Sequence, residues 1–225
     1  MPSIRSIALA VSVALFSASA LALPTTHNCH EPKVHAMGET YEQAASLCRD
    51  LVKDTNVGTF MTVMNGARGP QLEGYPFGSM DYYVDDCQNS GTPLMLLSHL
   101  QINMHNIKSS NKASLAIRRL PKEGERGNPM MDRRVTLMGH LVPVEKSRHA
   151  EVQACFVAGH PDAKWWLPDS GFHDFAWYTL EVESLYHVGG FGGIHHIGWI
   201  DVDTYKNAAT SSSAPAVESR LRVQY

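Results

Sequence analysis

The glycine-rich segment Gly189–Ile200, GGFGGIHHIGWI, constrains the fold of this chain more strongly than its other motifs. Four glycines surround Phe191 within five residues, and they follow an apolar segment typical of a strand, DFAWYTLEVESLYHV. Glycine is used where φ must be positive or where the backbone closely approaches another group. The segment is too rich in glycine for a helix and too apolar for a solvated linker. It therefore predicts a tight corner beside a packed surface at the end of a long strand.

The first 22 residues, 1–22, have the pattern of a secretory signal peptide. Arg5 supplies the positive charge, Ile7–Phe16 is apolar, and the small residues that follow offer cleavage after Ala20 or Ala22. The apolar part is too short to cross a bilayer core, which takes about 20 residues, and no later segment has the required length and apolarity. We therefore expect an exported protein without a membrane span, either secreted or held in an endolysosomal lumen.

The rest of the chain predicts one domain between two unpatterned ends. Residues 23–39 lack periodicity and are expected to form an N-terminal arm, whereas the Ser- and Ala-rich residues 207–225 predict a disordered tail. Residues 40–206 suffice for a single domain with a sizeable core. The formal net charge is −3 and the basic residues form no long stripe, so no binding to nucleic acid is expected.

Apolar periodicity predicts several strands and few helices. Thr40 and Gln43 form a capping box at the start of a helix. Strands are expected at 58–64, 77–84, 92–100, 113–120, 135–144 and 175–188, with a short last strand after the glycine corner. Further helices are expected over 101–109, from Ser147 to Val157 with a buried face of Ala150, Ala154 and Val157, and from Asp201 to Tyr205. This pattern predicts a closed or partly closed β-barrel with flanking helices.

Four cysteines offer disulfides if the protein is exported: Cys29, Cys48, Cys87 and Cys155. Three complete pairings exist, and the sequence does not choose among them. Cys48 and Cys155 lie on predicted helices among apolar neighbours, so buried free thiols are the alternative for those two. No Asn-x-Ser/Thr sequon occurs, and N-linked glycans are not expected.

Several segments in a fixed order carry a resemblance to known proteins. They are PLMLLSHLQINMHNIKSSNKASLAI, RRVTLMGHLVPV, CFVAGHPDAKWW and DFAWYTLEVESLYHVGGFGG. The chain resembles the flavin-binding split barrels related to pyridoxamine phosphate oxidase, and within them the secreted CREG (cellular repressor) family and the bacterial haem-utilisation proteins. The resemblance spans residues 40–206. It implies a mainly β (α+β) fold, a six-stranded antiparallel split β-barrel with flanking helices, which pairs into a homodimer.

The resemblance also implies where the phosphate of FMN would bind. In the flavin- and haem-associated branch the helix after the third strand commonly reads His-Thr-Arg-Asn, and here those positions read Asn103, Met104, His105 and Asn106. A mostly uncharged histidine cannot replace a guanidinium fork, so the site is weakened. The candidate cofactor-binding residues are Ser98, His105, Asn106 and Arg118. The alternative is that Ser98 and Asn106 satisfy local backbone groups and that Arg118 is a surface charge.

Histidines near the glycine corner offer a different chemistry. Haem takes one imidazole beside an apolar slot, and Phe191, Ile194 and Trp199 are available to line one. The candidate ligands are His187, His195 and His196. Adjacent strand residues point to opposite faces, so at most one of the last two faces a given pocket, and haem ranks below FMN. A further set on the N-terminal arm, suited to loose copper or zinc binding but expected to act only as a strap, comprises His27, Cys29, His30 and His35.

The sequence contains no G-x-S-x-G elbow, H-E-x-x-H motif or Walker loop. Together with the weakened phosphate site, this favours a secreted CREG-like split barrel without catalytic activity or a metal site. It would act as a homodimer that binds an unknown protein or small molecule. The alternatives are an FMN-dependent oxidoreductase and a haem-binding protein.

Overall fold

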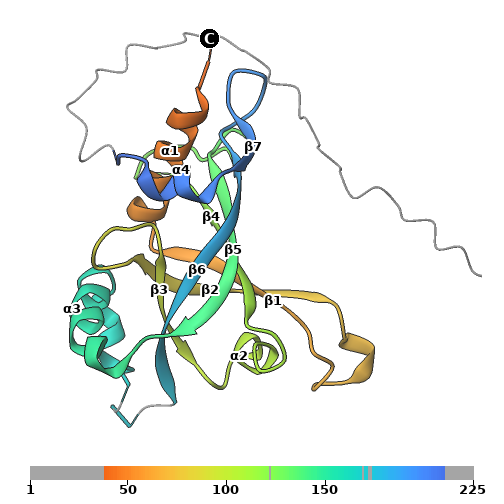
Figure 1. The fold of residues 1–225 in the computed structure, drawn as a ribbon, viewed down its shortest axis with the longest axis vertical. Helices are drawn as coiled ribbons and strands as arrows, with labels where there is room; N and C mark the ends of the chain where they lie inside the picture. The colour runs from red at the N-terminus through yellow and green to blue at the C-terminus, as the bar shows by residue number, and fades with distance from the viewer. Residues whose placement is uncertain (1–37, 122, 169, 172–173, 211–225) are drawn as a thin grey trace, which may run out of the picture. The chain divides into compact units, whose positions relative to one another are not determined.

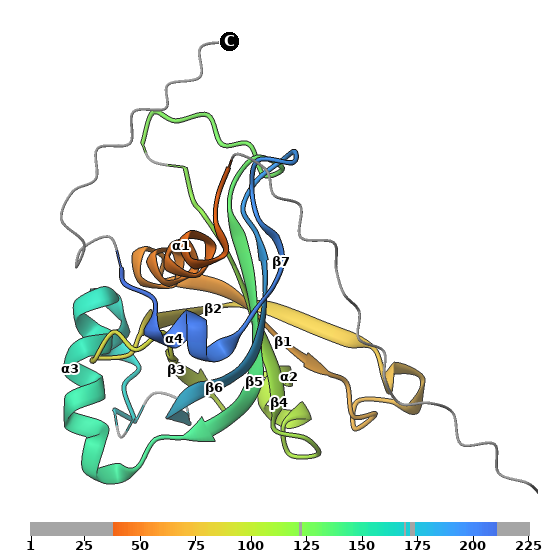
Figure 2. The same ribbon diagram turned by 45° about the horizontal axis from the view of Figure 1, so that its top comes forward.

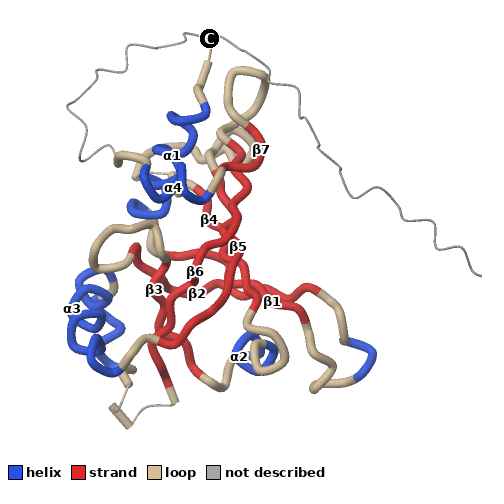
Figure 3. Tube along the Cα trace, in the orientation of Figure 1, coloured by secondary structure: helices blue, strands red, loops and turns tan. Residues whose placement is uncertain are grey.

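The computed structural model describes residues 38–121, 123–168, 170–171 and 174–210. Its centre is an antiparallel sheet in the order β3-β2-β1-β4-β5-β6-β7. The strands are β1 (Val57–Val63), β2 (Pro76–Asp85), β3 (Pro93–Ser98), β4 (Lys112–Arg118), β5 (Arg134–Pro143), β6 (Phe175–Val188) and β7 (Ile197–Ile200). Because β3 also pairs with β6, the first six strands close into a barrel and β7 lies outside it (Figures 1 and 3). The predicted six-stranded antiparallel barrel is confirmed.

The long strand β6 connects the barrel to the glycine corner. Its first residues pair with β3 and its last residues pair with β7, so two strands share one of its edges. Along the other edge β5 pairs from end to end, with a shift of register between Met138 and Gly139. A Cβ atom on Gly139 would collide with the carbonyl of Glu181, which explains why a glycine stands at this irregularity. β6 therefore closes the barrel by pairing with β3, and its far end leads directly into the glycine corner.

Helices lie around the barrel. In the described part of the chain they are α1 (Tyr41–Asp54), α2 (Ile102–Asn106), α3 (His149–Gly159) and α4 (Val202–Asn207), with short 3₁₀ turns η1 (Pro70–Leu72), η2 (Lys146–Arg148) and η3 (Pro161–Trp165). Figures 1 and 2 show α1 and α4 side by side, with α3 on another side of the barrel. None of the helices that the structure describes has the length and apolar character needed to span a bilayer.

The helix starts predicted at Thr40 and Asp201 are confirmed. At the capping box of α1 the Gln43 N–H donates to Thr40 Oγ1 at 3.2 Å, and the Thr40 N–H donates to Gln43 Oε1 at 2.8 Å. At α4 the Thr204 N–H donates to Asp201 Oδ2 at 2.9 Å. Such caps satisfy backbone donors that the helix itself leaves unpaired. They fix the positions at which the chain enters the two helices.

The described residues pack into two apolar clusters. The larger one joins the barrel interior to α1, and its members include Phe60, Leu115, Leu137, Leu180, Val52 and Cys48. The second lies between the barrel and α3, and its members include Leu94, Leu96, Val152, Phe156 and Trp177. Burying one large apolar side chain contributes about 1.5–3 kcal/mol, so each cluster anchors its helix to the barrel.

The predicted buried face of α3 was wrong. The residues assigned to that face are exposed or only half-buried in the structure: Ala150, Ala154 and Val157. Val152 and Phe156 are buried instead, and the Phe156 ring packs 5.2 Å from that of Trp177. Ser147 does not cap the helix, because it lies within η2. Apolar residues occur on every side of α3, so periodicity could not select a face, whereas packing of the large aromatic ring does.

The expectations for the two ends of the chain fall largely outside the described residues. The predicted signal peptide and most of the predicted arm lie within residues 1–37, and most of the predicted tail lies within residues 211–225. Asn207, where the tail was expected to begin, is the last residue of α4.

Candidate functional site

The four candidate cofactor-binding residues occupy two separate places. Ser98 ends β3, and His105 and Asn106 follow it on α2, whereas Arg118 is exposed at the far end of β4. Ser98 pairs beside the first residue of β6, and Arg118 is linked through β5 to the last residue of β6. These ends are about 40 Å apart along the strand, at about 3.3 Å per residue. Within one chain the structure does not bring Arg118 to the other three residues.

Asn103, at the start of α2, is fully buried and donates both of its amide hydrogens inside the protein. Its Nδ2 donates to the Phe60 carbonyl oxygen and to Ser79 Oγ, each at 3.0 Å. Its Oδ1 accepts the hydroxyl hydrogen of Thr62 at 2.7 Å. Buried polar groups are normally paired in this way, and here the pairing fastens α2 to β1 and β2.

Asn106, one turn later, is engaged in the same way. Its Nδ2 donates to Thr62 Oγ1 at 3.0 Å and to Met64 Sδ at 3.4 Å. Ser98 is also buried, and its Oγ accepts the Leu100 N–H at 3.2 Å. A phosphate needs hydrogen-bond donors, and both amide hydrogens of Asn106 are already donated, one to Thr62 of β1 and one to Met64 just after it. Of the candidates near α2, only His105 is half-exposed.

A second polar cluster lies where the chain entering α1 meets the loop after β6. The Glu39 carboxylate bridges two histidines, with His187 Nε2 3.2 Å from Oε1 and His195 Nδ1 3.2 Å from Oε2. On its other side, His187 places Nδ1 3.0 Å from Cys48 Sγ. We call this continuous row of hydrogen-bonded groups, Cys48–His187–Glu39–His195, the corner relay. It runs from the buried face of α1 to the surface of the glycine loop.

The charges of the corner relay follow from its burial. Burial raises the pKa of Cys48 far above its ordinary value, so this side chain is a neutral thiol that donates to His187 Nδ1. His187 Nε2 then carries the hydrogen donated to Glu39. Burial acts to raise the pKa of Glu39, but hydrogen bonds from His187 and His195 outweigh it and lower that pKa. The carboxylate accepts the Nδ1 hydrogen of His195.

His195 holds this position because glycine backbone packs against it. A Cβ on Gly190 would lie 2.7 Å from His195 Cδ2, and one on Gly189 would lie 3.0 Å from His195 Cβ. Gly192 has a φ of +89°, which other residues rarely adopt. The predicted tight corner beside a packed surface is confirmed. The His195 side chain remains 30% exposed.

His196 faces different neighbours from His195. Its ring lies 6.3 Å from that of His187, nearly parallel to it, and meets the ring of Tyr41 edge-on at 5.5 Å. Its Nε2 and the Nε of Arg133 are buried atoms without a hydrogen-bond partner in the described part of the chain. Large exposed apolar side chains follow one another along this loop and β7: Phe191, Ile194, Ile197 and Trp199. Among the described residues, no group of three or more His, Cys, Asp or Glu side chains is arranged to hold a metal ion.

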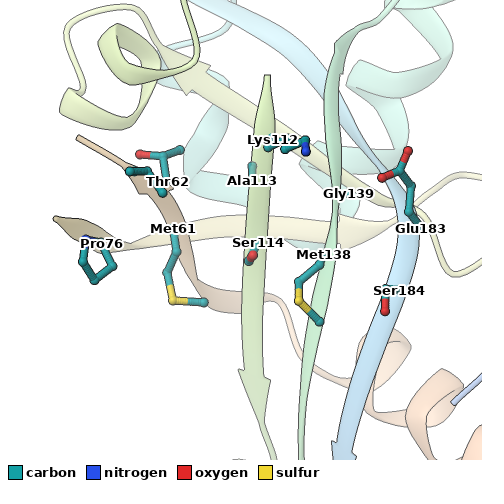
Figure 4. Close-up of a pocket in the computed structure, with 11 residues that line it drawn as sticks. Met61, Thr62, Pro76, Lys112, Ala113, Ser114, Met138, Gly139, Glu183 and Ser184 are labelled. Carbon is teal, nitrogen blue, oxygen red and sulfur yellow. The ribbon is translucent and has the colours of Figure 1, made fainter. Parts of the chain in front are cut away.

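The outer face of the barrel carries a third feature, an open pocket of about 390 Å³ across β1, β4, β5 and β6. Figure 4 shows the row of register-paired residues that crosses it: Met61, Ser114, Met138 and Ser184. Lys112 and Glu183 also line the pocket and carry its charges. Methionine side chains in the centre with charged groups beside them are typical of protein–protein contact surfaces. We call this surface the outer barrel face.

Together, the closed antiparallel barrel, the helix fastened by asparagines and the glycine corner after β6 define a split-barrel protein. The family model for the CREG beta-barrel matches residues 39–207. The chain therefore belongs to the CREG β-barrel family, and the resemblance inferred from its motifs is confirmed.

Two relatives of this chain are named for haem. The chain is 31% identical over 136 residues to the chloroplastic haem oxygenase HOZ of Arabidopsis thaliana, a match that covers 57% of this chain and 39% of that protein. The structure of a haem-binding protein from Mycobacterium smegmatis superposes with a TM-score of 0.60 and 25% identity, covering 74% of this chain and 61% of that one. This chain therefore matches less than two thirds of the length of either relative.

A third comparison supports the fold alone. The protein Atu2129 of Agrobacterium tumefaciens, whose function is unknown, superposes with a TM-score of 0.55 and 20% identity, covering 72% of this chain and 62% of that one.

Proposed function

We propose that this protein is a homodimeric binding protein of the CREG β-barrel family that works without FMN and acts after export from the cell. The observation that carries the proposal is the hydrogen bonding of α2, where Asn103 and Asn106 donate all their amide hydrogens inside the barrel. The dianionic phosphate of FMN is held by charge-assisted donors. At the position of the family's arginine this chain has His105, and Arg118 lies far away.

The visible spectrum of the purified full-length protein tests the absence of flavin. We expect no flavin absorption in protein isolated from the culture medium, either before or after addition of FMN and gel filtration. An FMN-dependent oxidoreductase is the alternative, and it would instead carry the yellow cofactor in stoichiometric amount. Mass spectrometry of the same material tests export, since the signal-peptide pattern predicts an N-terminus after Ala20 or Ala22. A protein that stays in the cells and begins at Met1 would overturn that part of the proposal.

The outer barrel face supports the homodimer. Met61 and Met138 lie exposed enough to be contacted there, and the neighbouring side chains are small, so a second copy can approach the sheet closely. Light scattering at micromolar concentration should give about twice the mass of the processed chain, which is somewhat below the 24.8 kDa of the unprocessed one. Met138→Arg should shift the protein to the monomer mass, because an unpaired charge in the centre of an interface is costly.

Leu100→Arg provides the matched control for this variant. Leu100 is exposed on the turn after β3 and does not line the pocket, so this change should leave the dimer intact. A wild-type protein that scatters as a monomer would contradict the proposal. So would a Met138→Arg variant that keeps the dimer mass.

A specific observation favours haem as the ligand of such a binding protein. Haem iron takes an imidazole nitrogen as an axial ligand. At the glycine corner His195 has Nδ1 held by Glu39 and Nε2 free, which is the arrangement that orients ligating histidines. The exposed Phe191 and Trp199 lie on the same loop and on the adjacent strand, so apolar surface is available for the porphyrin. The names of the Arabidopsis and mycobacterial relatives support the same choice.

Titration with haemin, followed at the Soret band, tests this second candidate. We expect saturable binding that weakens at least about tenfold in His195→Ala, and about tenfold in Glu39→Gln, which removes the charge that orients the ring. His105→Ala removes a half-exposed histidine from α2 and should bind haemin as the wild type does. Equal binding by His195→Ala and the wild type would eliminate His195 as the ligand.

A further inference from the structure

Two cysteines belong neither to the residues around α2 nor to the corner relay, and they lie on two elements that face each other. Cys87 is on the loop from β2 to β3, and Cys155 is on α3, and in the structure both are half-buried thiols. Both line an open pocket of about 500 Å³ between the end of β2, the end of α1 and α3. The Cys87 thiol donates to the Glu151 carbonyl oxygen, with Sγ 3.7 Å away. Glu151 lies one helical turn before Cys155.

Helix geometry brings the second thiol to the same place. Side chains on an α-helix lean towards its N-terminus, so Cys155 leans over the turn that Cys87 contacts. Both cysteines pack against the apolar cluster that contains Phe156 and Trp177. Burial, together with the neighbouring Cys87 thiol, raises the pKa of Cys155 to about 12.

We propose that Cys87 and Cys155 form a disulfide that fastens the β2–β3 loop to α3. The oxidant is a small or protein disulfide, as found along an export route. The thiolate of one cysteine attacks the donor disulfide and forms a mixed disulfide, releasing one donor thiol; the other cysteine then displaces the second donor thiol. The protein loses two hydrogen atoms, and the donor disulfide is reduced to two thiols.

The other described cysteine does not compete for this pairing. Cys48 is fully buried in the larger core, and its thiol donates to His187 as part of the corner relay. An oxidant in solvent cannot reach it without opening that core. Cys29 lies outside the described residues, so a link from Cys29 to Cys87 or Cys155 is the competing outcome that the experiment must detect.

The disulfide would join α3 to a loop that α1 and α4 already hold. Arg49 of α1 pairs with Asp85 at 3.5 Å, and the Asp85 carboxylate accepts the Gly91 N–H at 2.7 Å. From α4, the Tyr205 hydroxyl donates to the Gly91 carbonyl oxygen at 2.8 Å. Residues of α1, α3 and α4 therefore all contact the end of β2 or the loop that follows it. The disulfide would hold α3 to this loop covalently, in addition to the packing of the smaller apolar cluster.

The test is a titration of the purified full-length protein with glutathione buffers of increasing oxidation, followed by alkylation and peptide mapping without reduction. In the oxidising buffers we expect one peptide pair linking Cys87 to Cys155, with Cys48 alkylated only after denaturation. The melting temperature of the oxidised protein should exceed that of the reduced protein by roughly 5–10 °C. Persistence of both thiols in the most oxidising buffer would overturn the proposal, as would a link from either one to Cys29.

Two variants make the result specific. Cys29→Ser should form the same link and keep the difference in melting temperature between the redox states, whereas Cys155→Ser should lose both. If Cys155→Ser fails to fold, the peptide maps of the wild type and of Cys29→Ser still decide the pairing. The readout requires no ligand and no export, so failure of the disulfide leaves the proposed binding function standing, and the reverse also holds.

Discussion

The two regions of the barrel that resemblance and chemistry single out use their hydrogen bonds in opposite ways. Around α2, Asn103 and Asn106 donate every side-chain amide hydrogen to residues of β1 and β2 or to Met64 just after β1. At the glycine corner, the Glu39 carboxylate accepts hydrogen bonds from His187 Nε2 and His195 Nδ1, and Nε2 of His195 is not part of either bond. The first arrangement holds a helix in place, whereas the second ends at His195, whose side chain is 30% exposed. The positions of the motif on α2 are therefore present in the fold, but the amide groups of Asn103 and Asn106 hold the helix in place.

The largest expected effect concerns Asn103. Asn103→Ala should lower the free energy of unfolding by about 3 kcal/mol, because Phe60, Thr62 and Ser79 each lose a buried hydrogen-bond partner. Urea denaturation at pH 7 measures the change. His105→Ala, on the same helix but half-exposed, should cost less than about 0.5 kcal/mol. Equal losses in the two variants would mean that the asparagine network does not hold α2 as described.

The next effect concerns Glu39 and depends on pH. Glu39→Gln should cost about 1–2 kcal/mol at pH 7, because the carboxylate accepts charge-assisted bonds from both histidines. The pKa of Glu39 in the folded protein lies below its ordinary value of 4.5. Its contribution is therefore complete above that value and is lost as the pH falls through the folded-state pKa.

Urea denaturation at a series of pH values from 7 to 3 measures this dependence. The stability difference between wild type and Glu39→Gln should shrink as the pH falls below 4.5, the ordinary pKa of the group. Glu73→Gln, which alters an exposed carboxylate far along the chain, controls for general acid effects. A difference that stays constant down to pH 3 would show that Glu39 is not the ionised centre of the corner relay.

Local patterns in the sequence predicted most strands and a closed or partly closed barrel, and the resemblance to known proteins supplied its six-stranded architecture. The capping box at Thr40, the long strand before the glycine run and the tight corner itself each depend on neighbouring residues, and the structure confirms them. The face of α3 was not predictable, because apolar residues surround that helix and only the packing of Phe156 against Trp177 decides it.

The chemistry of the candidate sites was less accessible to sequence analysis. His187, His195 and His196 could be singled out, but Glu39, which organises two of them, was assigned to the N-terminal arm. It lies 148 residues from His187 in the chain, and no local pattern indicates such a contact. Motif positions around α2 were likewise recognisable, whereas the use of their amide hydrogens depends on partners from β1 and β2. The neighbouring thiols of Cys87 and Cys155 are also visible only once α3 is packed.

Whether α2 and its neighbours can hold the phosphate of FMN is tested most directly by the fluorescence of free FMN during titration with the purified protein. The hydrogen bonding of α2 predicts that flavin fluorescence stays unchanged up to a large excess of protein, and that His105→Ala gives the same result. Fluorescence that is quenched to saturation at one FMN per chain would contradict this prediction. Other side chains would then have to donate hydrogen bonds to the phosphate, because the amide hydrogens of Asn103 and Asn106 are already donated within the protein.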